Sequence, residues 1–284
     1  MKKSVDPLIL SARKKLHAVL KESLFVTDEN GVPSIADQNS KASVCFASNL
    51  FEQLNVAGGN RKCAQASGTE FENVIEQFLH NTFLEASLFR PGNWLIRRDK
   101  THIDQFQQFV HLAEIQKAVS EDPSLAASIG KDYLIRPDIV ILRKPEPDHI
   151  INETRQFVDS TSATLTGFRE VNNPHEILHA SISCKWTLRS DRAQNARSEG
   201  LNLVRNRKGR VPHIAVVTAE PLPNRIASLA LGTGDIDFVY HIALHELKKS
   251  VDQSEYDDSK EMLSTMINGN RLRDISDLPF DLVI

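Results

Sequence analysis

Cysteine is scarce in this sequence, and long apolar runs are missing. Three cysteines, Cys45, Cys63 and Cys184, occur among 284 residues, an odd number without the regular spacing of a disulfide framework. This pattern indicates reduced thiols and argues against a small disulfide-stabilised secreted protein. The sequence has no run of 18 apolar residues, and its opening segment MKKSVDPLIL is too short and polar for a signal peptide. We therefore expect a cytoplasmic bacterial protein that does not contact a membrane.

A large net charge is missing as well. The sequence contains 34 Lys and Arg residues and 37 Asp and Glu residues, so its net charge of -3 gives no overall sign of nucleic-acid binding. The distribution is uneven, because residues 185–210 hold eight basic and two acidic side chains and leave -9 on the other 258 residues. A basic segment on an acidic body is typical of a protein that contacts a polyanion at one place. The simpler interpretation is a solvated helix and loop.

Hydrophobic periodicity predicts helices in the first half of the chain. Thr69 and Glu72 form a Thr-x-x-Glu capping box and are expected to start one helix, and Pro123 is expected to open another. The segment 143–175 is rich in Pro, Asp and Asn and is expected to form loops. The predicted helices begin near residue 8, at residue 69, near residue 106 and at residue 123.

Alternation and β-branched residues predict strands in the second half. Residues 178–188 alternate between apolar and polar side chains, and 213–220 have the composition of a buried strand. A helix between them, capped by Ser190 or Asp191 and running to about Val204, completes a parallel crossover unit. The expected fold class is therefore α/β, with a central mixed β-sheet flanked by helices.

Two further segments extend this sheet. Residues 133–142 are predicted to form a strand whose hydrogen-bond ladder is interrupted by Pro137, directly before Asp138. Residues 236–244 are predicted to form a further strand or the start of a helix, and the chain beyond them is expected to be helical until residue 277.

Four side chains on separate elements of this α/β core have the composition of a nuclease site. Asp138 follows a proline in one strand, Lys185 lies on the polar face of the next strand, and Glu199 lies in the following helix. Glu72 belongs to the earlier helix. Carboxylate oxygens hold hard Mg²⁺ ions, which assist phosphodiester hydrolysis, and a lysine beside them can orient or deprotonate the attacking water. The spacing therefore favours metal-dependent phosphodiester hydrolysis.

Each of these residues also has an ordinary structural interpretation. Glu72 can serve only as half of a capping box, and Asp138 can merely end a strand. Lys185 can simply be solvated, and Glu199 can pair with a cation on its own helix. Their occurrence together, in this order and beside the basic segment, favours the nuclease site. Cys184 faces the apolar side of its strand and is interpreted as a packing residue.

The motif HEILH at residues 175–179 matches the zinc-protease pattern H-E-x-x-H. That pattern requires a helix, so that both histidines face one metal ion with the glutamate as base. Here Pro174 precedes the motif and His179 already belongs to the alternating strand, where residues four apart cannot share one zinc ion. We therefore interpret the motif as a coincidence, and His241 and His245 as structural residues.

The segments RPDIVIL and SISCKW resemble the nuclease core written PD...(D/E)xK. Longer segments, including RSDRAQNARSEGLNLVRNRKGR and LGTGDIDFVYH, resemble type IIF restriction endonucleases of the NgoMIV family, from about residue 60 to the end. The sequence departs from the general core at Ser183, which stands where that pattern has an acid. The resemblance implies that Glu199 replaces this ligand and that Asp138 and Lys185 complete the core site. Glu72 would be an additional acid, and Ser183 and Cys184 would support the site.

The resemblance also implies a full activity. Type IIF enzymes of this family cut double-stranded GCCGGC after the first G in a Mg²⁺-dependent reaction, with two ions per site, and leave 5′-phosphates on four-base overhangs. By the same resemblance, Gln65, Arg225 and Asp37 would contact the outer G·C pairs. The expected assembly is a homodimer that forms a homotetramer, in a cell that carries a cognate DNA methyltransferase. Residues 1–284 would form a single endonuclease domain, with residues 1–65 contributing to DNA contacts and residues 66–284 forming the catalytic core.

Base chemistry supports the inner part of this assignment independently. A CCGG core that is read by a two-fold dimer offers each subunit two C·G pairs. Each guanine accepts a bidentate arginine at O6 and N7, and each cytosine donates from N4 to a carboxylate. Arg189, Asp191 and Arg192, at the start of a helix about 191–204, supply this set.

Two other functions are compatible with these residues. A nuclease of the same core can act in repair or at DNA junctions and recognise structure, in which case it would nick rather than give discrete fragments. A DNA-binding module without catalysis would bind DNA but cut it with no divalent ion. The order of Asp138, Lys185 and Glu199 favours a nuclease over the binding module.

Overall fold

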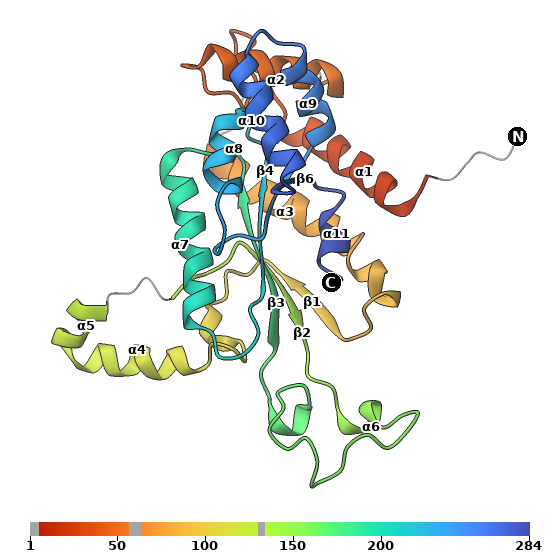
Figure 1. The fold of residues 1–284 in the computed structure, drawn as a ribbon, viewed down its shortest axis with the longest axis vertical. Helices are drawn as coiled ribbons and strands as arrows, with labels where there is room; N and C mark the ends of the chain where they lie inside the picture. Colours follow the sequence, from red (N-terminus) through yellow and green to blue (C-terminus); the bar gives the residue numbers. More distant parts are fainter. Residues whose placement is uncertain (1–5, 57–63, 130–133) are drawn as a thin grey trace, which may run out of the picture.

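A six-stranded mixed β-sheet runs through the centre of the molecule (Figure 1). The structure, a computed structural model, describes residues 6–56, 64–129 and 134–284. The strands follow one another in chain order across the sheet. They are β1 (Trp94–Arg97), β2 (Ile139–Arg143), β3 (Ile177–Lys185), β4 (His213–Thr218), β5 (Phe238–His241) and β6 (Leu272–Asp274).

The pairing of these strands divides the sheet into two halves. β2 is antiparallel to both of its neighbours, β1 and β3. The strands from β3 to β6 run parallel to one another. Parallel neighbours need a crossover, and α7 (Ser190–Asn206) supplies it between β3 and β4. The predicted α/β class with a mixed sheet and this crossover unit is confirmed. Asp138, Lys185 and Thr218 lie at one edge of the sheet, where β2 begins and the parallel strands end.

Helices cover the sheet and extend beyond it (Figure 1). In the orientation of Figure 1, α2, α8, α9 and α10 gather at the top, and α4 with α5 projects as an arm at the lower left. The segment 144–176, which contains α6, projects at the bottom. The remaining helices are α1 (Leu8–Ser23), α2 (Lys41–Leu54), α3 (Ala64–His80), α4 (His111–Glu121), α5 (Pro123–Ile129), α6 (Asp148–Ile151), α8 (Pro223–Ala230), α9 (Leu244–Asp252), α10 (Asp257–Asn268) and α11 (Leu278–Asp281).

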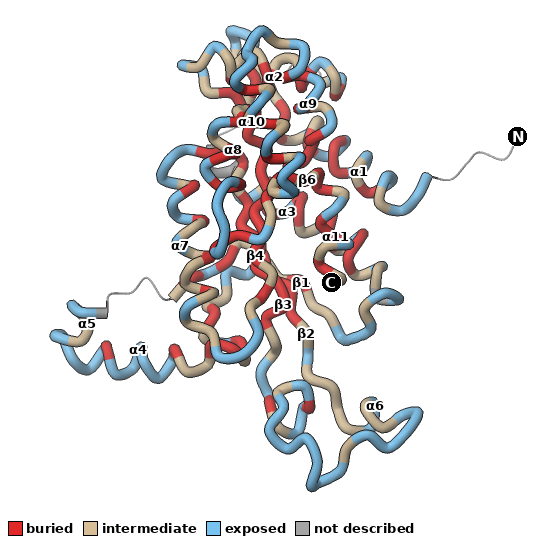
Figure 2. The backbone as a smooth tube through the Cα atoms, viewed as in Figure 1, coloured by how far each residue is buried: buried red, intermediate tan, exposed pale blue. Residues whose placement is uncertain are grey.

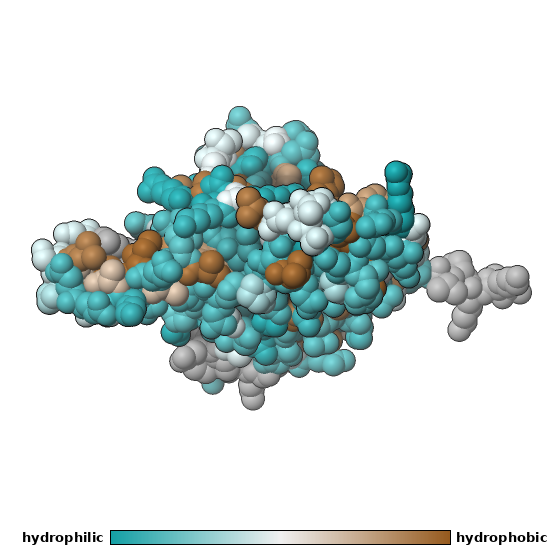
Figure 3. Space-filling view, turned by 90° about the horizontal axis from the view of Figure 1, so that it is seen from below, coloured by the Kyte–Doolittle hydropathy of each residue, from teal (hydrophilic) through white to brown (hydrophobic). Residues whose placement is uncertain are grey.

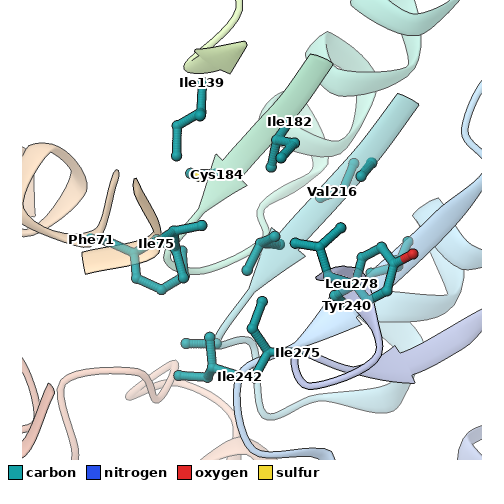
Figure 4. Packing of buried hydrophobic residues seen from close by; sticks show 14 of the residues in the cluster. Phe71, Ile75, Ile139, Ile182, Cys184, Val216, Tyr240, Ile242, Ile275 and Leu278 are labelled. Atoms are coloured by element: carbon teal, nitrogen blue, oxygen red, sulfur yellow. The ribbon is translucent and has the colours of Figure 1, made fainter. Parts of the chain in front are cut away.

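Burial follows the strands and the inward faces of the helices (Figure 2). Phe71 and Ile75, one turn apart on α3, are fully buried and pack toward the sheet, where Ile139 and Ile182 lie (Figure 4). The same buried cluster continues from Ala12 to Leu282, so helices from both ends of the chain share one core. The lower end, seen in Figure 3, has a largely hydrophilic surface with scattered apolar groups.

The polar face of β3 is buried as well. His179, Ser181 and Ser183 are each less than a tenth exposed, because β3 lies inside the sheet and is covered on both sides. His179 contacts the carbonyl oxygen of Leu282 through Nε2. It lies in a strand, and His175 is exposed at the turn before it, so the interpretation of HEILH as a coincidence is confirmed.

Several helix boundaries were predicted wrongly. α3 begins at Ala64, so Thr69 lies inside the helix and does not cap it. The N-cap of α7 is Arg189, whose side chain makes no capping hydrogen bond, rather than Ser190 or Asp191. The predicted strand at 133–142 is shorter and starts only after Asp138, as the proline before it requires. Periodicity also missed β1 and β6, which are too short to show alternation, and α2 and α8.

Candidate active site

Asp138 is placed by the start of β2. Ile139 pairs with Ile182 of β3, so the preceding carboxylate lies beside the last residues of β3. Its Oδ2 accepts a hydrogen bond of 2.8 Å from the backbone N–H of Cys184 and lies 3.0 Å from Nζ of Lys185. Two consecutive residues of β3 therefore fix one carboxylate oxygen.

Glu199 reaches the same point from α7. The hydroxyl oxygen of Ser183 lies 3.5 Å from Oδ2 of Asp138 and 3.5 Å from Oε2 of Glu199, so these two carboxylate oxygens are separated by no more than the sum of those distances. Gly200, the next residue on α7, allows this approach, because a Cβ there would collide with the backbone oxygen of Asp235. The structure thus brings together Asp138, Lys185 and Glu199, as their order predicts.

Glu72 approaches from α3 on the other side. It is buried, and its Oε1 lies 3.5 Å from Nζ of Lys100. Its Oε2 accepts no hydrogen bond among the described residues, although Nη1 of Arg98 lies 3.9 Å away. Burial, and then the negative charge of Asp138, raise the pKa of Glu72. An unsatisfied buried carboxylate beside another carboxylate is unfavourable unless a cation joins them.

The remaining ionisable groups respond to the same surroundings. Burial raises the pKa of Glu199, and the charge of Asp138 adds to that rise, whereas Lys185 opposes it. Burial alone would lower the pKa of Lys185, but the nearby charges of Asp138 and Glu199 raise it, so its ammonium form is stabilised. Cys184 is a free buried thiol whose pKa is raised by burial, and it contributes its backbone N–H rather than its sulfur.

The donor set fits a hard divalent cation. Asp138, Glu199 and Glu72 offer carboxylate oxygens, which Mg²⁺ and similar ions prefer. Within residues 6–56, 64–129 and 134–284, no three acidic, histidine or cysteine side chains are already close enough together to hold a metal ion. Lys185 instead contacts Asp138, and Lys100 contacts Glu72, so each cation compensates one carboxylate. Oε2 of Glu72, which accepts no hydrogen bond among the described residues and has only the distant contact with Arg98 at 3.9 Å, is the atom that this arrangement leaves for a cation.

The predicted base-reading residues lie just beyond this site. Arg189 and Asp191 are exposed at the start of α7, and Nη1 of Arg192 donates hydrogen bonds of 3.2 Å to the carbonyl oxygen and the hydroxyl of Thr187. Arg189 and Arg225 line one pocket of ≈ 470 Å³. The two sets of predicted readers are therefore adjacent.

The structure describes two of the three side chains predicted to contact the outer G·C pairs. Arg225 and Asp37, which are far apart in the chain, form an ion pair with each other. A hydrogen bond from the backbone of Asn39, and then Arg225, lower the pKa of Asp37. The side chain of Gln65 lies outside the described part of the structure.

Sequence reasoning missed a second group of cations beside the site. Arg98 pairs with Glu76 at 3.1 Å, and Lys100 contacts Glu72. Lys100 has a positive φ of 54°, which turns the chain after β1. Arg136, two residues before Asp138, donates its Nε–H to Nε2 of His102 at 2.8 Å. The run RRDK at residues 97–100 is the signal that could have indicated them.

Comparisons with known proteins show which family the sequence matches. The sequence matches the family described as NgoMIV restriction enzyme over residues 16–284. The chain belongs to this family. It is 46% identical to the type II restriction enzyme NgoMIV of Neisseria gonorrhoeae, over 99% of this chain and 100% of that protein. Among solved structures, a complex of the restriction endonuclease PspGI with substrate DNA matches 97% of this chain and 90% of its own, with a TM-score of 0.36 and 15% identity.

Membership of the NgoMIV family makes the chain a type II site-specific deoxyribonuclease, as the resemblance implied. DNA is therefore its partner, and a divalent metal ion its cofactor. No helix of the described residues has both the length and the apolar composition needed to cross a bilayer.

Proposed function

We propose that this enzyme recognises double-stranded GCCGGC and cleaves after the first G, which leaves 5′-phosphates on four-base overhangs. The main support is that Asp138, Lys185 and Glu199 converge at the end of β3. The segment Arg-Ser-Asp-Arg, at the N-cap and first turn of α7, follows directly. Cutting and base-reading groups that share one strand end can respond together to one DNA sequence. The resemblance and the family support the site and the cut position.

Each residue of the site has a distinct role in this proposal. Asp138 and Glu199 would hold Mg²⁺, and Glu72 would supply the oxygen for a second ion or for its bound water. When bound, the ions polarise the phosphate, generate hydroxide and stabilise the leaving oxygen. The Lys185 ammonium, held 3.0 Å from Asp138, would orient the attacking water and offset phosphate charge. The Cys184 N–H fixes Asp138, and the Ser183 hydroxyl lies 3.5 Å from an oxygen of each carboxylate and can donate to either one.

The inner C·G pairs would be read by the start of α7. Arg189 and Arg192 would each donate to a guanine, and Asp191 would accept from a cytosine. Arg225, Asp37 and Gln65 would contact the outer pairs. The pocket that Arg189 and Arg225 share supports the assignment of inner and outer pairs to adjacent side chains.

The proposed assembly is a homodimer that pairs into a homotetramer. The segment 144–176 supports it, because Phe157, Leu165 and Val171 expose 64%, 95% and 71% of their surface. We also propose that residues 1–284 act as one endonuclease domain in the bacterial cytoplasm, where a cognate methyltransferase would protect the host's own sites. The single buried core supports the one-domain assignment.

Digestion of one DNA of known sequence tests the proposal. With Mg²⁺, discrete fragments whose ends map after the first G of each GCCGGC are expected. Cleavage at another sequence would refute the proposed specificity, and structure-dependent nicking would indicate a junction nuclease instead. The Lys185→Ala variant is the matched control, because it should give no fragments from the same DNA.

A further inference from the structure

Glu220 is a completely buried carboxylate that the proposed reaction does not use. It lies two residues beyond the end of β4, with 0% of its surface exposed. Its Oε2 accepts a hydrogen bond of 2.7 Å from the backbone N–H of Leu188, and its Oε1 accepts one of 3.2 Å from the N–H of Leu222. One side chain therefore connects two loops that are more than 30 residues apart in the sequence.

Both loops carry proposed base-reading residues. Leu188 precedes Arg189 and the start of α7, and Leu222 is the N-cap of α8, whose third residue is Arg225. Arg225 also lies 3.9 Å from Oε2 of Glu220 through its Nη1.

The hydrogen bonds and ion pairs around Glu220 extend to the other proposed base-reading residues. Arg225 forms an ion pair with Asp37, which belongs to the N-terminal part of the chain. Thr187, directly before Leu188, accepts the hydrogen bonds of Arg192. Proposed inner and outer readers are thus joined through one carboxylate, in the order Asp37, Arg225, Glu220, Leu188, Thr187 and Arg192.

A buried carboxylate that connects two loops costs stability, because its charge is removed from water. Burial raises the pKa of Glu220 to about 7, and the hydrogen bond from Leu188 and the charge of Arg225 oppose that rise. A buried ionisable group lowers stability relative to an apolar residue of similar volume, but it fixes geometry through its directional hydrogen bonds. Base discrimination depends on such geometry, because a bidentate arginine must match two acceptor atoms.

We propose that Glu220 is a positioning residue for sequence recognition, which holds the start of α7 and the start of α8 in one register. Its carboxylate couples the reading of the inner C·G pairs to the reading of the outer pairs. The inference rests on the proposed function for the identity of the six base pairs, but the coupling itself follows from the hydrogen bonds.

Binding measurements test this coupling. The Kd of the full-length protein is measured in Ca²⁺ for GCCGGC duplexes, for duplexes with one inner pair changed and for duplexes with one outer pair changed. In Glu220→Ala, the preference for GCCGGC should fall about 10-fold at both positions, because the N–H groups of Leu188 and Leu222 lose their acceptor. In Glu220→Gln, which keeps one oxygen acceptor, the fall should be about 3-fold at both positions.

The thermal midpoint of each variant is measured in parallel, because a purely structural role would lower stability and leave the preferences unchanged. Asp281→Ala is the matched control, since Asp281 is a partly buried carboxylate in α11 that accepts from Tyr240 at 2.7 Å. It should lower the midpoint without changing either preference.

Unchanged preferences, or a loss confined to one position, would overturn the coupling. If Glu220→Ala does not fold, Glu220→Gln decides by the same criterion. The wild-type protein separates the two proposals. If it prefers another sequence, the proposed function fails, and the coupling is then measured on that sequence.

Discussion

Two buried clusters in this molecule each combine basic side chains with carboxylates, yet their electrostatics are opposite. In the first cluster, Arg13 of α1 donates to both oxygens of Asp274 at 2.8 Å and to Glu246 at 3.0 and 2.6 Å. Burial alone would raise the pKa of Asp274, but the hydrogen bonds and charge of Arg13, with hydrogen bonds from Ser276, lower it to about 2. Burial alone would raise the pKa of Glu246, but the hydrogen bond and the charge of Arg13 together lower it. Every negative charge in this cluster has a partner.

The active-site cluster is compensated only in part. Lys185 contacts Asp138, but the pKa values of Glu199 and Glu72 are raised, first by burial and also by the charge of Asp138. The side chains of Asp138 and Lys185 are 18% and 15% exposed, and those of Asp274 and Arg13 are 1% and 12% exposed. All four are mostly buried, so solvent access alone does not explain why carboxylate pKa values are raised in one cluster and lowered in the other.

The difference is one of geometry and of spare acceptors. The planar guanidinium of Arg13 satisfies both carboxylates of its cluster. The ammonium of Lys185 contacts Asp138, Glu72 has only longer contacts with Lys100 and Arg98, and Glu199 has no ion pair among the described residues. Uncompensated carboxylates lower stability, but a divalent cation requires them as ligands. The first cluster therefore connects α1 to the sheet, and the second is suited to chemistry.

The largest expected effect concerns activity. Asp138→Ala or Lys185→Ala should lower the cleavage rate in Mg²⁺ by about 10⁴-fold, because each removes a group that touches the metal or the attacking water. Single-turnover cleavage of a GCCGGC duplex measures this loss. Both variants should fold and should still bind the duplex in Ca²⁺. Cleavage at a wild-type rate by either variant would contradict the assignment of the active site.

The corresponding substitution in the first cluster should affect stability rather than activity. Asp274→Ala should lower the free energy of unfolding by about 3–5 kcal/mol, since it leaves the Arg13 charge buried with one carboxylate fewer. Urea denaturation measures this change. The cleavage rate of the remaining folded protein should stay within a few-fold of wild type. A stable Asp274→Ala protein would show that the two clusters do not differ in their structural role.

The contrast between the clusters also shows what could be predicted from the sequence. Asp138, Lys185 and Glu199 were predicted because each lies in a local pattern, a proline before a strand, an alternating strand and the helix after it, and because these patterns resemble a known nuclease core. The Arg13 cluster was not predicted, because its members are up to 261 residues apart and no local pattern marks them. The same reason hides Glu220 and the Asp37–Arg225 ion pair. The run RRDK marks Lys100 as basic, but its contact with Glu72, 28 residues away, follows only from the fold.

Acid should affect the first cluster in a defined pH range. The pKa of Asp274 is about 2 in the folded protein and near 3.9 in the unfolded chain, so the unfolded state binds the proton more readily. The resulting stabilisation, about 2 kcal/mol, is present above pH 4 and is lost as the pH falls toward 2. Urea denaturation between pH 2 and pH 6 measures it. In Arg13→Met, this part of the pH dependence should largely disappear, and persistence of the full dependence would contradict the assigned cause.

Arg192 should contribute to base recognition rather than to stability, in contrast to Arg13. Arg192 donates two hydrogen bonds of 3.2 Å to Thr187 and has no carboxylate partner among the described residues. Arg192→Ala should therefore change the free energy of unfolding by less than ~0.5 kcal/mol. It should instead cost roughly 1–3 kcal/mol of discrimination at one guanine, measured as the ratio of Kd values for cognate and single-pair-changed duplexes. An unchanged preference at every base would remove Arg192 from the reading set.

The smallest effect should have the opposite sign from that in the first cluster. Glu72→Gln removes a buried charge whose Oε2 has no hydrogen-bond partner among the described residues and which lies near Asp138. The free energy of unfolding at pH 7 should rise by ~0.5 kcal/mol, because relief of repulsion and of the burial of charge outweighs the weak contacts with half-exposed Lys100 at 3.5 Å and with Arg98 at 3.9 Å. Glu246→Gln is the matched control and should lower stability, since Arg13 then loses a charged partner. If both substitutions lowered stability equally in urea denaturation, Glu72 would be a structural residue like Glu246 rather than an acid held ready for a cation.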